Sequence, residues 1–381
     1  VHEIRAEQEK YDKQLTKIKV VGAGGGGSNA VNRMIEAGIT HVDFIAVNTD
    51  LQVLETAMAK TRIPLGSKIT RGLGAGGKPE IGEKAAIEDS EIIAEHLAGA
   101  DMVFITAGMG GGTGTGSAPV IAQIARDCGA LTVAVVTKPF AFEGPVKMRL
   151  AQEGIEKLKD AVDVLITIPN QNIFKIADKN LSIIDAFRLA DDVLRQGVQG
   201  ISDLITKPGE VNIDFADVRT VMENQGEAVM GIGRAGGDNR AIEAAERAIK
   251  NPLLEDVSIE GAEKILVNVT ASKSYTAHEF NETLSYIFGK VSPEAFVTYG
   301  LVADESMKDE VAVTVVATGI AGTRGQARLA TTMDAIKPSG NIISSKDWEK
   351  IFQNKEKASY LQSRNDEEFL EVPTVLRRAG D

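Results

Sequence analysis

Seven residues in the first third of the chain, Gly110 to Gly116, read Gly-Gly-Gly-Thr-Gly-Thr-Gly. They follow an apolar run over residues 102–107 and precede a helix-like stretch that begins near Ser117. Glycines leave the backbone N–H groups uncovered, the threonines add hydroxyls, and the following helix directs its positive end toward the loop. This tract predicts an anion site that needs no lysine, and phosphate is the anion it favours.

A second glycine-rich tract lies upstream. An apolar run over residues 18–21 leads into Gly-Ala-Gly-Gly-Gly-Gly-Ser-Asn at residues 22–29 and then into an apolar-periodic helix. The tract contains G-x-G-x-x-G, which also opens dinucleotide-binding folds. There an acidic residue near the end of the second strand holds the ribose, whereas the strand expected here ends in Asn48. A nicotinamide cofactor is disfavoured but stays open, since two such tracts at one sheet edge suit a di- or triphosphate better.

A third stretch, residues 72–79, reads Gly-Leu-Gly-Ala-Gly-Gly-Lys-Pro and nearly matches the Walker A pattern. That pattern ends in Ser or Thr because a hydroxyl must reach magnesium, and Pro79 has none. No buried strand leads into the stretch. We interpret it as a mobile loop over the phosphates, followed by one helix from Pro79 through Leu97.

Composition excludes several classes of protein. The chain has 381 residues, of which 43% are apolar, a net charge of −12 and a single cysteine, Cys128. No apolar stretch is long enough to cross a membrane, and nucleic-acid binding needs a basic face that this charge argues against. One cysteine allows no intramolecular disulfide, so we expect a soluble protein of the reducing cytoplasm, with Cys128 as a small core residue.

Apolar runs alternate with helical patterns over the first half of the chain. The expected strands cover residues 19–21, 42–47, 102–107, 131–137 and 164–168. This alternation predicts an α/β fold with a parallel, Rossmann-like sheet covered by helices on both faces. A periodic helix over residues 182–205 follows, with a length of about 36 Å at 1.5 Å per residue. We expect a nucleotide-binding domain over residues 18–206, after a loose extension at residues 1–17.

Beyond residue 206 a second, smaller α/β pattern begins. Helical segments at residues 215–222, 239–249 and 278–287 alternate with strands at 228–232, 264–269, 295–302 and 311–317. We expect a domain over residues 207–320, in which the last two strands can pair as antiparallel neighbours. Apolar density then falls, which predicts a disordered linker over residues 321–369, with a transient helix at Trp348 as one hypothesis, and a tail at 370–381.

Two carboxylates follow the long helix, in Asn-Ile-Asp-Phe-Ala-Asp at residues 212–217. If Asp214 opens a helix, Asp214 and Asp217 share one face. They can act as an N-cap with a favourable charge at the helix dipole, or they can polarise water or hold a cation at a phosphate. The long helix separates them from both glycine tracts, so the nucleotide of a neighbouring subunit is the easier target.

These motifs in this order resemble a known family. The tract at residues 110–116 resembles the tubulin signature motif. Together with the tract at 22–27, Ala-Val-Asn-Thr-Asp at 46–50 and the segment at 212–217, it identifies the chain as a member of the bacterial FtsZ family of tubulin-like cell-division GTPases. The resemblance implies a GTPase domain and a smaller C-terminal domain joined by a central helix, with head-to-tail assembly into protofilaments of the division ring.

The resemblance also implies roles for individual residues. Phosphate contacts are implied for Gly25, Gly26, Gly27, Ser28 and Asn29, and for Gly112, Thr113 and Gly114. Glu143 matches the ribose-binding acid. Asn170, Phe187 and Asp191 match a guanine pocket, in which amide and carboxylate read the edge of the base while the ring packs on its face. The family usually has arginine where this chain has Lys147, and lysine supplies the charge but not the fork geometry.

For the loop after the long helix, the resemblance implies catalysis in trans. Asn212, Asp214 and Asp217 would enter the site of the next subunit and orient the attacking water near the γ-phosphate and its Mg²⁺. Hydrolysis of GTP to GDP would then start with assembly, at the mid-cell division site. No metal ligand is assigned to this chain, and it is expected neither to bind nucleic acid nor to insert into membranes.

The C-terminal segment begins at Leu370 and ends with Arg378, and it resembles the family's tail peptide, which docks division proteins and membrane tethers. Val375 stands where the family commonly has an aromatic residue, which predicts weaker docking because less area is buried. Two other functions stay open. A nicotinamide oxidoreductase explains only the first glycine tract, and a non-catalytic scaffold would bind nucleotide only to polymerise.

Overall fold

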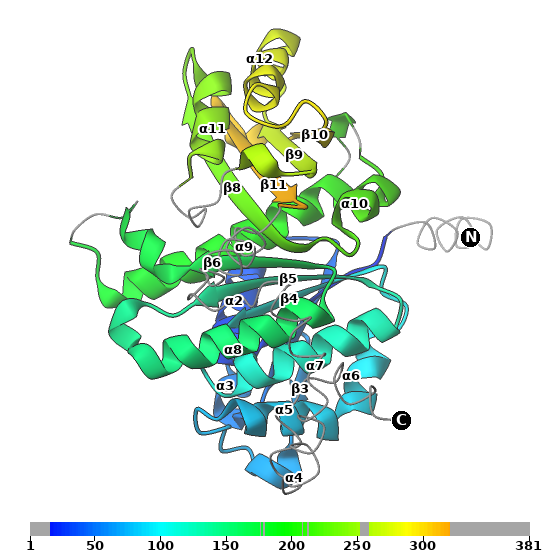
Figure 1. The fold of residues 1–381 in the computed structure, drawn as a ribbon, viewed down its shortest axis with the longest axis vertical. Coiled ribbons are helices and arrows are strands. Elements are labelled where there is room, and N and C mark those ends of the chain that lie inside the picture. Colours follow the sequence, from blue (N-terminus) through cyan, green and yellow to red (C-terminus); the bar gives the residue numbers. More distant parts are fainter. Residues whose placement is uncertain are drawn as a thin grey trace, which may run out of the picture. The chain divides into compact units, whose positions relative to one another are not determined.

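A parallel sheet between two helical layers forms the first half of the chain (Figure 1). The computed structural model describes residues 16–175, 177, 180–207, 209–211, 213–251 and 259–320. The parallel strands lie in the order β3-β2-β1-β4-β5-β6. Their bounds are β1 (Ile18–Ala23), β2 (Val42–Asn48), β3 (Thr61–Pro64), β4 (Met102–Gly108), β5 (Leu131–Lys138) and β6 (Val164–Pro169). The predicted parallel α/β sheet is confirmed, with β3 as a short edge strand that the apolar pattern missed.

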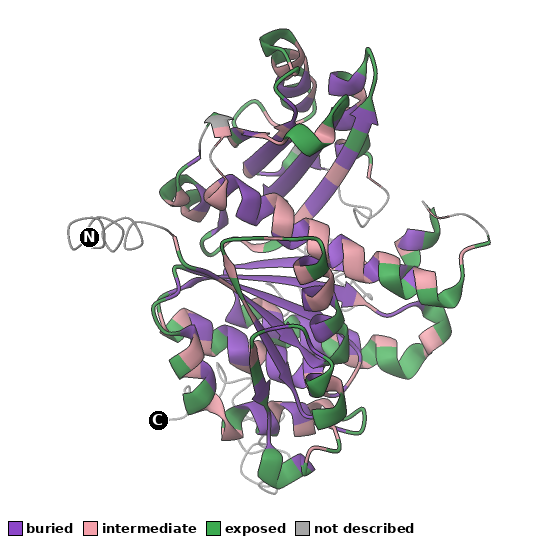
Figure 2. Ribbon diagram, turned by 180° about the vertical axis from the view of Figure 1, so that it is seen from behind, coloured by how far each residue is buried: buried purple, intermediate pink, exposed green. Residues whose placement is uncertain are grey.

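Helices cover both faces of this sheet, and the strands between them are buried (Figure 2). Helices α2 and α9 pack on one face and α5 to α8 on the other. The bounds are α2 (Gly24–Glu36), α3 (Leu51–Glu55), α4 (Ser67–Thr70), α5 (Pro79–Glu88), α6 (Ser90–Leu97), α7 (Thr113–Asp127), α8 (Pro145–Ala161) and α9 (Ile183–Thr206), with 3-10 turns η1 (Ala141–Glu143) and η2 (Asn170–Lys175). Cys128 caps the C-terminus of α7 and packs half-buried against the core.

Three helices differ from expectation in their bounds. α2 and α7 begin at Gly24 and Thr113, so both glycine tracts are partly helical rather than loops. The predicted helix from Pro79 to Leu97 is two helices, α5 and α6, which separate at Asp89. The carboxylate of Asp89 accepts a hydrogen bond from the N–H of Gly66 at 2.6 Å, and this tertiary contact accompanies the break.

The second half adds a mixed sheet, which joins the first through β8. Its elements are β7 (Gly209–Val211), α10 (Phe215–Met222), β8 (Gly226–Gly236), α11 (Arg240–Ile249), η3 (Ile259–Gly261), β9 (Lys264–Ala271), α12 (Ala277–Phe288), β10 (Phe296–Ala303), η4 (Glu305–Met307) and β11 (Glu310–Thr318). The beginning of β8 pairs in parallel with β6, and its length pairs antiparallel with β11.

The suggested hairpin of the last two strands is wrong. β11 lies between β8 and β9, whereas β10 pairs in parallel with β9 and antiparallel with β7. Burial explains this order. Nearly every residue of β11 is buried, which requires a central position, while β10 carries the exposed Phe296 and Tyr299 and lies toward the edge.

The described residues belong to one compact unit. The predicted domain boundary at residue 207 stays a prediction. Residues 1–15, Asn212, and the predicted linker and tail, with Trp348 and the segment from Leu370 to Arg378, lie outside the described residues. Among the described helices, none has the length and apolar character that a membrane span needs.

Candidate active site

The parallel strands bring most of the predicted nucleotide residues to one edge of the sheet. The carboxyl ends of β1, β4, β5 and β6 lead respectively into α2, the tract at residues 109–112, the turn that holds Glu143, and Asn170. The strands are paired in parallel register, so these ends lie side by side. The residues predicted for phosphate, ribose and base therefore share one edge.

Helices α2 and α7 direct their N-termini to this edge without caps of their own. Neither has a side-chain cap or an acidic residue in its first turn. The first four N–H groups of a helix have no partner within it, and the helix dipole places positive charge there. Two uncapped N-termini at one edge suit an anion with several oxygens, such as a chain of phosphates.

The two glycine tracts touch each other. Gly24 has φ +71°, and a Cβ added to it would stand 2.8 Å from the amide nitrogen of Gly114. The stretch at residues 72–79 also packs here, because a Cβ on Gly112 would stand 2.8 Å from the Cβ of Ala75. The glycines therefore allow backbone segments to approach more closely than side chains would permit.

Two buried oxygens among the predicted residues have no hydrogen-bond partner within the described part of the chain. Ser28 is 2% exposed and its Oγ is unpaired, and Asn170 is 5% exposed with an unpaired Oδ1. A buried polar atom without a partner costs free energy, about 1–3 kcal/mol. A ligand that supplies the missing partners would remove that cost. Of the other first-tract residues, Gly27 is buried and Gly25, Gly26 and Asn29 are exposed.

Phe187 belongs to an aromatic cluster that sequence analysis did not foresee. Its ring meets Phe140 edge-on, with centroids 5.3 Å apart, and lies 6.1 Å from Phe142. Phe174 completes the cluster at 5.3 Å from Phe140. Phe140 is fully buried, while Phe142, Phe174 and Phe187 are exposed enough to offer ring surface. A flat aromatic ligand such as a base can pack here. The only sequence signal was the position of Phe142 next to Glu143.

Asp191 lies one helical turn beyond Phe187, and its carboxylate accepts no hydrogen bond from the described residues. Burial raises its pKa from 3.8 to about 7, against the opposing charge of Arg33 on α2. Hydrogen bonds from the N–H groups of a ligand would stabilise the charged form of this partly buried carboxylate. Guanine presents N–H groups on one edge, which the carboxylate of Asp191 and the unpaired amide oxygen of Asn170 are both able to accept.

Glu143 already has partners that orient it. Its carboxylate accepts hydrogen bonds from the N–H of Phe140 at 2.9 Å and from Nζ of Lys147 at 3.1 Å. A carboxylate has room for further donors, so the ribose hydroxyls can still be bound. The carbonyl of Lys147 lies directly against Gly110, which brings α8 to the second glycine tract.

Asp214 and Asp217 lie at the opposite edge of the sheet. Helix α9 ends beside the start of β1, where Ile205 and Thr206 line a small cavity with residues 16–18. After α10, the N–H groups of Gln225 and Gly226 donate to the carbonyl of Asp163, just before β6. Both contacts place α10 at the amino-terminal edge of the parallel strands. The structure therefore does not bring Asp214 and Asp217 to the glycine tracts of their own chain.

At that edge, Asp214 caps α10 as expected. Its Oδ1 accepts the N–H of Asp217 at 2.8 Å. Both residues are exposed. Their carboxylates still have free oxygens that face solvent and can take further donors.

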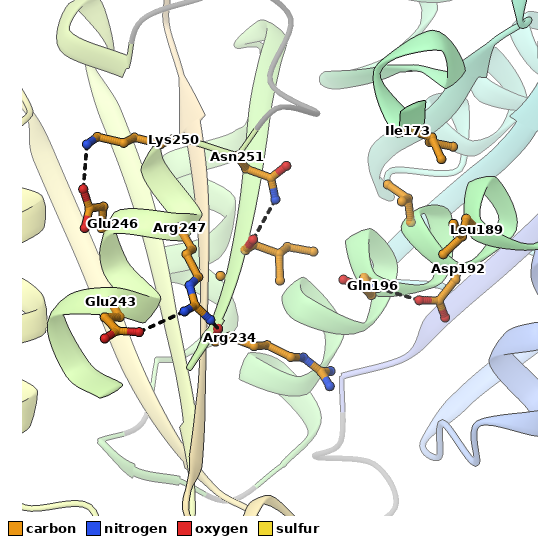
Figure 3. A pocket seen from close by; sticks show the side chains of 13 residues that line it. Ile173, Leu189, Asp192, Gln196, Arg234, Glu243, Glu246, Arg247, Lys250 and Asn251 are labelled. Atoms are coloured by element: carbon orange, nitrogen blue, oxygen red, sulfur yellow. Dashed lines mark hydrogen bonds and ion pairs between the residues drawn. The ribbon is translucent and has the colours of Figure 1, made fainter. Parts of the chain in front are cut away.

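A cleft of about 750 Å³ lies elsewhere, between α9 and the pair of β8 and α11 (Figure 3). Asp192 faces it and accepts hydrogen bonds from Gln196 and Arg195, which outweigh burial and lower its pKa. Ile173 and Leu189 line the cleft and also pack against the aromatic cluster. The cleft thus borders the aromatic cluster around Phe140, but none of the predicted site residues lines it.

Comparison with known proteins decides the family. A model described as the GTPase domain of the Tubulin/FtsZ family matches residues 17–178, and one described as the C-terminal domain of the FtsZ family matches residues 226–321. The chain belongs to the Tubulin/FtsZ family. It is a guanine-nucleotide-binding cell-division GTPase, as the resemblance predicted. The nicotinamide alternative is no longer supported.

Relatives and solved structures of this family agree over most of the chain. The Cell division protein FtsZ of Pseudomonas putida is 48% identical over 97% of this chain and 98% of its own, and that of Azotobacter vinelandii has the same figures. The empty FtsZ dimer of M. jannaschii superposes with a TM-score of 0.79 at 45% identity, covering 84% of this chain and 92% of that one. CetZ2 from Haloferax volcanii shares the fold, with a TM-score of 0.67 at 19% identity over 86% of this chain and 100% of that one.

Proposed function

We propose that GTP binds at the carboxyl-terminal edge of the parallel sheet and is hydrolysed only when a second copy of the chain brings its Asp214 and Asp217 to that site. One observation carries the proposal. The residues that suit a nucleotide and the two exposed carboxylates lie at opposite edges of the same sheet, at the two ends of α9. When copies stack in the same orientation, the carboxyl-terminal edge of one copy faces the amino-terminal edge of the next.

Each part of GTP has a counterpart at the first edge. The uncapped N-termini of α2 and α7 receive the phosphates, with Ser28 and Thr113 as hydroxyl donors. Glu143 takes the ribose hydroxyls, and the base packs on Phe187 while its edge is read by Asn170 and Asp191. Asn170 and Ser28 gain partners that they lack without a ligand.

Hydrolysis then needs an oriented water molecule and little covalent chemistry from the protein. Asp214 and Asp217 of the incoming copy, with Asn212, would hold that water in line with the γ-phosphate. Mg²⁺ would fit this edge because it binds mainly phosphate oxygens and water and needs few protein oxygens. When bound, the ion would neutralise charge that develops on the phosphates.

Assembly and partners follow from the same proposal. The chain would polymerise head to tail. Among its structural relatives, the FtsZ of M. jannaschii has been solved as a dimer and CetZ2 from Haloferax volcanii as a GTPgS-bound protofilament. We propose a cytoplasmic location at the division site. We also propose that the tail from Leu370 to Arg378 binds division proteins and membrane tethers through apolar Val372, Val375 and Leu376 and basic Arg377 and Arg378.

The proposal is tested by measuring phosphate release per molecule against protein concentration, with pelleting of polymer in parallel. A site shared between copies requires specific activity to rise steeply at the concentration where polymer first pellets. Constant specific activity below and above that concentration would contradict a shared site. Polymer that pellets with GTP but releases no phosphate would instead favour the non-catalytic scaffold.

A further inference from the structure

A residue outside both glycine tracts contacts the predicted phosphate site through a single hydroxyl. Thr49 follows β2 and is 1% exposed. Its Oγ1 lies 2.6 Å from Oγ1 of Thr113, the first residue of α7. Thr113 itself is only half-buried. A buried hydroxyl therefore contacts the hydroxyl of the half-buried residue that begins α7, at the helix N-terminus where the proposed function puts a phosphate.

The direction of this hydrogen bond is fixed once an anion binds. A hydroxyl has one proton to donate, and phosphate oxygens only accept. If Thr113 donates to a phosphate, its oxygen must accept from Thr49, so the protons point along one line from Thr49 to Thr113 to the phosphate. Hydrogen bonds arranged in such a chain polarise and strengthen each other.

Thr49 is also held firmly in place. Its carbonyl accepts hydrogen bonds from the N–H of Gly74 at 3.1 Å and from the hydroxyl of Thr70 at 3.3 Å. The next residue, Asp50, forms a bridge with Leu73 and caps α3. The hydroxyl of Thr49 is thus fixed between the second glycine tract and the stretch at residues 72–79, which packs on Gly112.

We propose that Thr49 is a positioning residue for the phosphates: it orients the hydroxyl of Thr113 as a donor and ties that contact to the stretch at residues 72–79. The inference rests on the proposed function, since it requires Thr113 to bind phosphate. It assigns a role to a residue that neither glycine tract contains.

The test measures GTP, GDP and guanosine affinity for the full chain and five variants. Thr49→Val removes the hydroxyl at nearly constant volume and should weaken GTP and GDP about fivefold, the loss expected for one hydrogen bond. Thr49→Ser retains the hydroxyl and should bind within about twofold of the parent. Guanosine, which has no phosphate, should bind all variants equally. Thr56→Val, at an exposed threonine whose hydroxyl donates to the carbonyl of Val53, is the matched control.

A double variant shows whether Thr49 acts through the hydroxyl of Thr113 or only stabilises the fold. Thr49→Val added to Thr113→Val should cause no further loss of GTP affinity, because both act through one contact. Full additivity, or an equal loss of guanosine affinity, would overturn the proposal. So would unchanged GTP affinity of Thr49→Val beside a weakened Thr113→Val. Normal GTP binding by Thr113→Val would contradict the proposed phosphate contact of Thr113, and with it the proposed function, rather than the role of Thr49 alone.

Discussion

The two edges of the parallel sheet are built in different ways. At the carboxyl-terminal edge, the predicted ligand contacts come from main-chain N–H groups and from buried side chains such as Ser28 and Asn170. At the amino-terminal edge, Asp214 and Asp217 are exposed and extend from the first turn of α10. A preformed, desolvated edge can bind a ligand alone, whereas exposed carboxylates become effective only when another surface excludes water from them. Nucleotide binding and hydrolysis should therefore be lost separately when one edge or the other is mutated.

The largest effect is expected from Asp217→Ala. It should reduce phosphate release by about 100- to 1000-fold, the usual loss when one oriented group is removed from the reacting centre. GTP affinity of the monomer should stay within about twofold, because Asp217 lies far from its own nucleotide edge. Glu223→Ala, at the other end of α10, is the matched control and should keep its activity. Equal loss of binding and hydrolysis in Asp217→Ala would break the distinction between the edges.

The next largest effect is expected from a substitution at the nucleotide edge, which is the other half of the proposed active site. Gly112→Ala places a Cβ 2.8 Å from the Cβ of Ala75 and 2.9 Å from the N of Lys78, so the backbone must shift. Such overpacking costs about 1–3 kcal/mol, and where the shifted backbone bears this cost on binding, GTP affinity should fall by about 5- to 150-fold. Gly111→Ala is its control, since a Cβ there meets nothing within 4 Å. Equilibrium binding of a fluorescent GTP analogue distinguishes the two.

A mixture of these two variants tests whether one active site takes its halves from two copies. Polymer of Asp217→Ala retains intact nucleotide edges, and Gly112→Ala retains intact carboxylates. If one active site takes its halves from two copies, phosphate release from the mixture should exceed the sum of the separate activities. No gain on mixing, although the two variants pellet together, would argue that each chain completes its own site.

The pKa of Asp191 gives a smaller, pH-dependent effect. Burial raises its pKa to about 7, so the group is half-protonated at neutral pH. Guanine donors favour the charged form, which means that binding releases a proton and GTP affinity falls by up to about tenfold from pH 8 to pH 6. Asp191→Asn should abolish this slope, whereas Asp192→Asn, whose carboxyl has a lowered pKa, should keep it. Calorimetry in buffers of different ionisation enthalpy counts the released protons.

The same shift affects stability with a defined sign. The unfolded carboxyl titrates near 3.8 and the folded one near 7, so the folded state retains the proton longer. Stability of the nucleotide-free protein should therefore fall as pH rises from about 4 to 7 through this group. Bound GTP should offset the loss, and thermal melts with and without GTP across this range measure the difference.

Sequence patterns predicted the strands and the central helix well, but they did not predict the contacts that distant segments make at the nucleotide edge. Continuous apolar runs predicted β4 and β5 almost to the residue, and the helical period predicted α9 to within one residue at each end. The structure adds that Ser182 is the N-cap of α9. Sequence placed the starts of α2 and α7 too late, because glycine disfavours helices and only tertiary contact, such as Gly24 against Gly114, stabilises them there. Neither the aromatic cluster around Phe140 nor the hydroxyl pair of Thr49 and Thr113 has a local pattern, since their partners come from distant segments.

The smallest effect is expected at Lys147, where this chain departs from the arginine of its family. Its side chain is 52% exposed and pairs with Glu143 at 3.1 Å. Exposed pairs of this kind contribute about 0–1 kcal/mol, so Lys147→Arg should change GTP affinity by less than about threefold. Glu143→Gln should cost more, because it removes the charge that holds Lys147 and the acceptor proposed for the ribose. A change above tenfold in Lys147→Arg, measured at the same ionic strength, would mean that fork geometry at this position matters despite its exposure, and that the nucleotide edge is less preformed than the comparison assumes.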